Sequence, residues 1–174
     1  MMDHPEGLRI EPIQRKHKVR PFDCGEQSLN EYISRYAFSN DRNNISKSFV
    51  LTDNNHHVYG YYSVCASSIE FSELPQGATG RLPRYPIPAA LIARLAVDSA
   101  AQGNDYGGRL LIDALQRIVH TSEELGITVV SVDALHEKAR AFYERYGFQS
   151  FPGNELKLFL PIETVLKTAI SYKL

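Results

Sequence analysis

The feature that most constrains this chain is an apolar run of strand length, followed by a glycine-containing turn and an amphipathic helix. The run is LIARLAVD, residues 91–98, and its near-continuous apolarity is typical of a strand buried on both faces of a sheet. After the turn, apolar residues recur at helical spacing from Leu110 to Val119 and stop near Gly126. This strand–turn–helix order predicts an α/β chain in which residues 91–98 lie in the middle of a sheet.

A second amphipathic helix is expected near the start of the chain. Asp23 and Glu26 have the spacing of an N-cap residue and its capping-box partner. The apolar stripe that follows them consists of Leu29, Tyr32, Ile33, Tyr36 and Ala37. The sequence therefore predicts a helix that packs one face onto the core.

Further strands and a short helix complete the predicted order of elements. Strands are expected at 8–13, 47–53, 58–70, 127–134 and 155–160, with a short helix at 137–146 that Gly147 closes. Gly60 marks a bulge in its strand, and the prolines and glycines of 72–90 predict an irregular loop. Residues 161–174 fit either a further strand or a loose helix.

Composition limits the class of protein. The 174 residues predict about one domain, residues 1–174, at roughly 150 residues per domain. The formal net charge of -1 excludes a global basic field, so contact with nucleic acid needs a local patch. The two cysteines suit a reducing compartment, and no run has the length of a signal peptide or membrane span, so a cytoplasmic protein with no membrane partner is expected.

The turn after residue 98 has the character of an anion site. Free N–H groups and the positive end of the helix dipole attract phosphate, and glycines let the backbone approach it closely. Neither the Walker pattern nor the G-x-G-x-x-G spacing is present. From composition alone, an ordinary glycine-rich turn explains the segment equally well.

Two motifs together resemble the GNAT N-acetyltransferase superfamily. Residues 102–107, QGNDYG, resemble the family's Q/R-x-x-G-x-G/A motif, and residues 139–148, ARAFYERYGF, resemble its second signature. The segments FDCGEQSLNEYI and RLPRYPIPAALIARLAVD are similar to the toxin branch of toxin–antitoxin pairs (TacT/AtaT-like), whose members acetylate the α-amine of aminoacyl-tRNA. The resemblance covers nearly the whole chain.

This resemblance implies a single-domain GNAT fold of the α/β (α+β) class, with a mixed sheet, a splayed strand pair and flanking helices. Acetyl-CoA is the implied co-substrate. The implied cofactor-binding residues are Leu95, Ala96, Val97, Gln102, Gly103, Asn104, Asp105, Tyr106, Gly107 and Gly108. The family usually has glycine where this chain has Asp105, which leaves three outcomes: weaker cofactor binding, a side chain turned to solvent, or a less active protein. We expect the second, because the neighbouring glycines keep the loop flexible.

By resemblance, Tyr143 is the general acid that protonates the departing thiolate. Without the resemblance, the better explanation of Tyr143 is a packed aromatic beside Phe142 and Phe148. No carboxylate stands out as a base, and Glu70 and Asp98 are reserve candidates with capping or surface roles as alternatives. An α-amine, with a pKa of about 7.7 to 8.0 before esterification lowers it, needs less help from a base than lysine.

An RNA acceptor requires clustered basic residues. The candidates are Arg15, Lys16, Lys18, Arg20, Arg81, Arg84, Arg140 and Arg145. Arg94, inside an apolar strand, needs a partner and is expected to orient site groups or contact substrate. His56 and His57 lack a third ligand at metal spacing, so no metal site is predicted.

The toxin resemblance implies a ribbon-helix-helix antitoxin as a protein partner. A homodimer is also expected, although the sequence itself does not reveal the oligomeric state. Two alternatives remain open at the level of sequence. One is a metabolic or protein N-acetyltransferase, and the other is a GNAT module that binds a partner without turnover.

Overall fold

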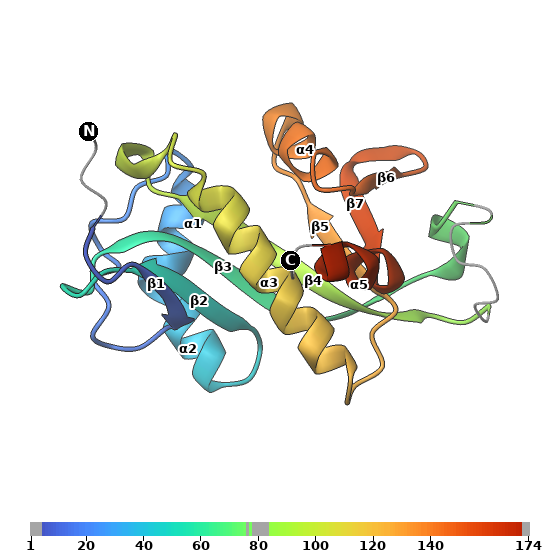
Figure 1. Cartoon of the computed structure of the whole chain (residues 1–174), viewed down its shortest axis with the longest axis horizontal. Coiled ribbons are helices and arrows are strands. Elements are labelled where there is room, and N and C mark those ends of the chain that lie inside the picture. Colours follow the sequence, from blue (N-terminus) through green and yellow to red (C-terminus); the bar gives the residue numbers. More distant parts are fainter. Residues whose placement is uncertain (1–4, 76, 78–83, 172–174) are drawn as a thin grey trace. The chain divides into compact units, whose positions relative to one another are not determined.

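The protein is a mixed α/β structure with one seven-stranded sheet in the described residues. The structure is a computed structural model that describes residues 5–75, 77 and 84–171 (Figure 1). The strands are β1 (Arg9–Pro12), β2 (Lys47–Thr52), β3 (Val58–Ile69), β4 (Ile87–Val97), β5 (Val129–Asp133), β6 (Gln149–Phe151) and β7 (Asn154–Pro161). Their order is β1-β2-β3-β4-β5-β7-β6, with β4 and β5 parallel and β5 and β7 antiparallel. The predicted fold class is confirmed.

The three regions predicted to be helical are helices, with differences at their ends, whereas the short helices that follow β3 and β4 were not predicted. They are α1 (Gln27–Glu31), η1 (Tyr32–Tyr36), α2 (Ala37–Arg42), η2 (Phe71–Glu73), η3 (Ser99–Ala101), α3 (Tyr106–Ser122), α4 (Glu137–Glu144) and α5 (Ile162–Ser171). None of the described helices has the length and hydropathy that a membrane span requires.

The chain divides into two compact units. The first comprises 1–65 and 93–114, and the second comprises 66–92 and 115–174. β3, β4 and α3 each contribute residues to both units.

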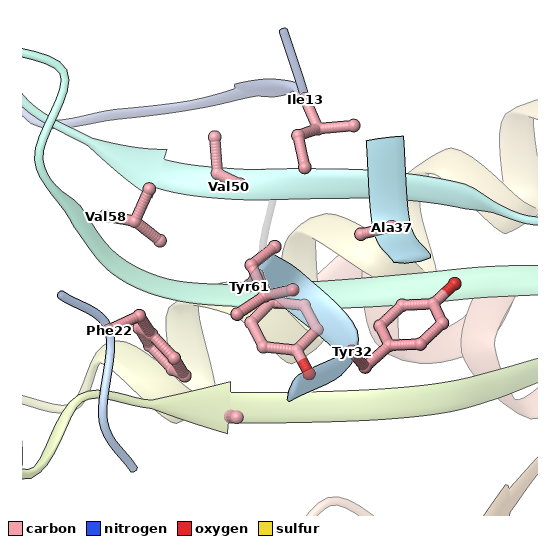
Figure 2. Packing of buried hydrophobic residues seen from close by; sticks show 9 residues of the cluster. Ile13, Phe22, Tyr32, Ala37, Val50, Val58 and Tyr61 are labelled. Atoms are coloured by element: carbon pink, nitrogen blue, oxygen red, sulfur yellow. The ribbon is translucent and has the colours of Figure 1, made fainter. Parts of the chain in front are cut away.

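The core of the first unit lies between its strands and the helical segment α1–η1–α2 (Figure 2). Its buried members are Ile13, Phe22, Tyr32, Ile33, Ala37, Val50, Val58, Tyr61 and Ala96. The predicted bulge is present, because Leu51 pairs with Gly60 while Thr52 pairs with Val58. A Cβ on Gly60 would lie 2.9 Å from the Ala96 carbonyl oxygen and 2.8 Å from Leu110 Cδ1, so only glycine lets β3 approach β4 and α3 this closely.

The second unit has its own apolar core. Ile69, Leu74, Ile87, Ala89, Val129, Phe151 and Phe159 are buried together there. α4 and α5 both pack against β7. α4 ends before Gly147, whose φ of +93° is the left-handed conformation that a glycine C-terminal to a helix commonly adopts.

The first helix does not begin with the predicted capping box. Its N-cap is Glu26, which makes no side-chain cap bond. The Asp23 carboxylate instead accepts hydrogen bonds from Gly25 N at 2.9 Å and Asn30 Nδ2 at 2.8 Å. Tyr36, predicted in the apolar stripe, is 51% exposed, because the π-helical turn η1 winds more widely than 3.6 residues per turn and rotates it outward.

Other boundaries also differ from the predictions. β4 begins at Ile87, so residues 87–90 of the predicted loop are strand. Pro88 is tolerated near the strand start, and its carbonyl accepts a hydrogen bond from Thr128 N at 2.9 Å. β6 was not predicted, and α5 settles the choice for the C-terminal segment in favour of helix.

Candidate functional site

The turn that follows β4 is held by two aspartates. Asp98 caps η3, because its Oδ1 accepts a hydrogen bond from Ala100 N at 2.9 Å. Its Oδ2 accepts one from Asp23 N at 3.0 Å, and Ser99 N donates to the Asp23 carbonyl at 2.8 Å. The segment before α1 is therefore hydrogen-bonded to the start of the turn, and Asp98 has the capping role that was the alternative to a catalytic base.

The next part of the turn forms an open backbone loop. Gly103 has a φ of +89°, and a Cβ built on it would meet nothing within 4 Å. Gln102 Nε2 donates to the Val97 carbonyl at 3.2 Å, and Asn104 Nδ2 donates to the Ala101 carbonyl at 2.9 Å. Two side chains thus fix the loop from inside while the space beside Gly103 stays free.

The loop leads directly into the N-terminus of α3. The helix starts at Tyr106, and Arg109 N donates to the Asp105 carbonyl at 3.1 Å. The N–H groups in the first turn of a helix have no acceptor within the helix. Gly107 and Gly108 have no side chains that could shield the N–H groups there. Free N–H groups, a positive helix end and an open loop together make a cradle for an anion.

Asp105 adopts the backbone conformation that glycine favours, with a φ of +59°. Aspartate tolerates this region better than most residues. Its side chain is exposed. The side chain therefore lies in solvent, and an aspartate holds the left-handed conformation at this position.

The end of β4 extends past its pairing with β5. The register of the two strands runs from Ala89 opposite Val129 to Ile92 opposite Val132, whereas β4 continues to Val97. Leu95 and Val97 lie beyond the residues that pair with β5, so main-chain groups on this edge are available to a ligand. Ala96 points into the first core instead and is 6% exposed.

In the second unit, Tyr143 is buried within an aromatic cluster on α4. Its ring lies 5.1 Å from Phe142 and 5.6 Å from Phe148, in edge-to-face geometry. It is 6% exposed, and its hydroxyl has no hydrogen-bond partner among the described residues. Burial, with a smaller contribution from Asp133, raises the pKa of the Tyr143 hydroxyl. The hydroxyl therefore stays protonated at neutral pH, as a proton donor must.

A family model described as acetyltransferase (GNAT) domain matches residues 44–150, which is more than half of the chain. The chain belongs to the GNAT acetyltransferase family. The matched GNAT range contains the turn, the end of β4 and Tyr143, and it takes residues from both compact units.

Named relatives narrow the comparison within the GNAT family. A Mycobacterium tuberculosis protein named tRNA-acetylating toxin is 36% identical over 142 residues, covering 82% of this chain and 84% of that protein. A Sinorhizobium fredii protein named probable toxin TacT is 34% identical over 166 residues, covering 90% and 92%.

Solved GNAT structures agree with this comparison. AtaT complexed with acetyl-methionyl-tRNAfMet superposes with a TM-score of 0.87 at 32% identity, covering 93% of this chain and 99% of that chain. AtaTR bound with AcCoA superposes with a TM-score of 0.83 at 33% identity, covering 93% and 98%.

The turn fits the diphosphate of acetyl-CoA. The space beside Gly103 and the positive N-terminal end of α3 suit a doubly charged group, and the Asp105 side chain is exposed to solvent.

The basic residues predicted to contact RNA differ in their surroundings. Lys16 forms an ion pair with Glu11 at 3.3 Å, and Arg15 lies over the Phe38 ring at 5.3 Å. Arg20 and Arg84 are exposed.

Three further basic residues were predicted to contact RNA. Lys18 is exposed, and Arg145 lies 5.7 Å over the Phe142 ring. Arg81 lies outside the described residues.

Arg140 is already engaged by acidic neighbours. It contacts Glu137 at 2.9 Å, Glu155 at 3.2 Å and Glu144 at 3.7 Å. A phosphate at Arg140 would have to compete with these three carboxylates.

Sequence reasoning missed two supports of the site. Asp23 joins the segment before α1 to the turn, and its spacing to Glu26 misleadingly suggested a cap. Tyr32, predicted as an ordinary core residue, lies under the Arg94 guanidinium. Neither contact has a local sequence signal, because each joins residues more than 60 positions apart.

Proposed function

We propose that this protein is an acetyl-CoA-dependent N-acetyltransferase that acetylates the α-amine of aminoacyl-tRNA and acts as the toxin of a type II toxin–antitoxin system. The observation that carries the proposal is the 36% identity, over 82% of this chain, with a protein named tRNA-acetylating toxin. The likeness to AtaT complexed with acetyl-methionyl-tRNAfMet supports the acceptor, and the likeness to AtaTR bound with AcCoA supports the donor.

The donor is held mainly by main-chain groups. In this proposal, the loop around Gly103 and the first turn of α3 bind the diphosphate. Leu95 and Val97 bind the pantetheine arm and polarise the thioester carbonyl through backbone amides of β4. Acetyl-CoA supplies the activated acetyl group.

Proton transfer falls to a single side chain. Tyr143 donates its proton to the sulfur as the amine attacks and the carbon–sulfur bond breaks. Glu70 and Asp98, the reserve candidates for a base, both serve as caps, in η2 and η3 respectively. A neutral fraction of the acceptor amine at physiological pH replaces a base, because an α-amine titrates well below lysine.

The acceptor requires positive charge near the reactive amine. Lys18, Arg20 and Arg84 are exposed and have no ion pair with another described residue, so they are the basic residues best able to bind phosphate.

The toxin proposal includes an antitoxin and a second copy of the chain as protein partners. A complex of AtaT with the C-terminus of the antitoxin AtaR has a TM-score of 0.82 with this chain. By this likeness we propose that an antitoxin neutralises the protein. We further propose that the antitoxin is of the ribbon-helix-helix type, that the toxin is a homodimer formed from single GNAT domains spanning residues 1–174, and that it acts in the cytoplasm.

Radiolabelled acetyl transfer to total charged tRNA tests the function. The protein should transfer label from acetyl-CoA to aminoacyl-tRNA and not to deacylated tRNA. Label on free amines or protein N-termini alone would identify a metabolic or protein acetyltransferase, and the absence of any coenzyme A release would identify a binding module.

A further inference from the structure

In the first unit, an arginine that has no ion-pair partner among the described residues lies over a tyrosine ring. Cζ of Arg94 lies 3.6 Å from the centroid of the Tyr32 ring. Arg94 is half-buried and makes no hydrogen bond or ion pair with another described residue. Among the described residues, the buried side-chain atoms that lack a hydrogen bond include none from Arg94, so its N–H donors reach solvent and are accessible to a ligand.

The tyrosine beneath Arg94 is fixed from several sides. The Tyr32 hydroxyl lies 2.7 Å from Ser46 Oγ, and Asn40 Nδ2 donates to it at 3.5 Å. The ring stacks against Tyr61 with centroids 6.4 Å apart, and Figure 2 shows the two rings side by side with their hydroxyls pointing in different directions. The Tyr61 hydroxyl in turn donates to the Leu29 carbonyl at 2.7 Å.

The local helix geometry also supports a dedicated role for Tyr32. It is the first residue of the π-helical turn η1, between α1 and α2. Such turns are rare and frequently occur at functional sites. The backbone thus departs from a regular α-helix at Tyr32, the residue over whose ring Arg94 lies.

This arrangement leaves a particular surface of the arginine available. Stacking occupies one face of the guanidinium, and the five N–H donors lie in its plane, pointing outward along the edge. A planar fork of this kind suits phosphate or carboxylate oxygens. The donor's diphosphate is assigned to the loop around Gly103, and the 3′-phosphate of its adenosine lies beyond the diphosphate, away from the thioester. A phosphate that binds Arg94, next to the residue assigned to the pantetheine arm, would therefore belong to the acceptor.

We propose that Arg94, held in place by Tyr32, binds a phosphodiester near the 3′ end of the RNA acceptor and positions the aminoacyl amine. The inference rests on the proposed function and narrows the acceptor to amines carried on a phosphodiester chain. Arg94 precedes Leu95, which is assigned to the pantetheine arm, so the residue lies on the strand that delivers the acetyl group. Arg94 is therefore a positioning residue.

The test compares two acceptors with the same reactive amine. One is aminoacyl-tRNA, and the other is the methyl ester of the same amino acid, which has no phosphate. For Arg94→Gln, the ratio of kcat/KM for tRNA to kcat/KM for the ester falls about 10- to 100-fold, the effect of losing charge-assisted hydrogen bonds. The fall appears mainly in KM for tRNA.

Two further variants sharpen the comparison. Arg94→Lys keeps the positive charge but lacks the planar fork of N–H donors. Its ratio of kcat/KM for tRNA to kcat/KM for the ester lies between those of Arg94→Gln and wild type. Arg42→Ala removes another arginine that lies over an aromatic ring, 5.9 Å from the Phe38 centroid, and keeps the wild-type ratio.

Circular dichroism and calorimetric binding of acetyl-CoA are measured for each variant. A folded Arg94→Gln protein with the wild-type ratio overturns the proposal, as does an equal loss on both acceptors. If Arg94→Gln fails to fold, the same ratio is measured for Arg94→Lys, and a folded Arg94→Lys protein with the wild-type ratio overturns the proposal. Wild-type protein that acetylates the ester but not aminoacyl-tRNA refutes the proposed function itself, a result visible without any variant.

Discussion

The turn after β4 and the helix α4 contribute to the proposed reaction in opposite ways. The turn acts through its main chain, shaped by Gly103 and fixed by the Asp98 cap. α4 acts through one hydroxyl, that of Tyr143, in an apolar cluster. A main-chain site is expected to tolerate a changed side chain, such as Asp105 in the turn, whereas a side-chain site is expected to lose its function with a single oxygen atom.

The largest effect is expected from removing that oxygen atom. Tyr143→Phe should lower kcat for acetyl transfer by about 100- to 10,000-fold, the range for loss of a general acid. Acetyl-CoA affinity and thermal stability should change little, because the hydroxyl has no partner among the described residues. Stopped-flow measurement of thiol release and differential scanning calorimetry provide the two readouts. A Tyr143→Phe protein with normal kcat would assign Tyr143 to packing alone.

The pH profile distinguishes the two regions without a mutation. The turn contributes main-chain groups that do not titrate, and burial raises the pKa of Tyr143 above its ordinary value. The rate should therefore rise with pH as the acceptor amine loses its proton, up to the amine pKa of about 8 or lower. It should then level off rather than fall as pH approaches the ordinary tyrosine pKa of about 10. A descending limb near neutral pH in initial-rate assays would show that the acid is another group.

A larger residue at Gly60, where β3 approaches β4 and α3, tests the main-chain site. Gly60→Ala places a Cβ 2.9 Å from the Ala96 carbonyl oxygen and should destabilise the fold by about 1–3 kcal/mol. Acetyl-CoA binding should weaken as well, since β4 and α3 carry the cradle. Gly126→Ala is the matched control, because a Cβ there meets nothing within 4 Å. Urea unfolding of both variants makes the comparison, and equal midpoints would contradict the close approach at Gly60.

The smallest effect is expected at the residue that departs from the family motif. Asp105→Gly should leave the Kd for acetyl-CoA within about 2-fold of wild type, because the carboxylate lies in solvent and charges there are strongly screened. Isothermal titration calorimetry measures the Kd. Markedly tighter binding by the glycine variant would mean that Asp105 repels the diphosphate.

The two regions also differ in how far the sequence predicts them. The strand, the glycine-containing turn and the following helix are recognisable because they are contiguous and depend on residue type, as at Gly103. The aromatic cluster around Tyr143 is contiguous too, but only the family resemblance separates an acid from a packed ring.

Contacts between distant segments escaped prediction. The backbone N–H of Asp23 donates to the Asp98 carboxylate, and Arg94 lies over the Tyr32 ring, and both contacts depend on the tertiary fold. Tyr36 was misplaced because helical spacing assumes an unbroken α-helix, and η1 interrupts it. β4 starts earlier than predicted because Pro88, near the strand start, needs no N–H partner there.

Mass spectrometry of the aminoacyl-adenosine released from tRNA by nuclease tests the central claim most directly. After incubation with acetyl-CoA, the released species should carry one acetyl group on its α-amine, and the same reaction with Tyr143→Phe should leave it nearly unmodified. An aminoacyl-adenosine that stays unacetylated while the wild-type protein binds acetyl-CoA would contradict the account.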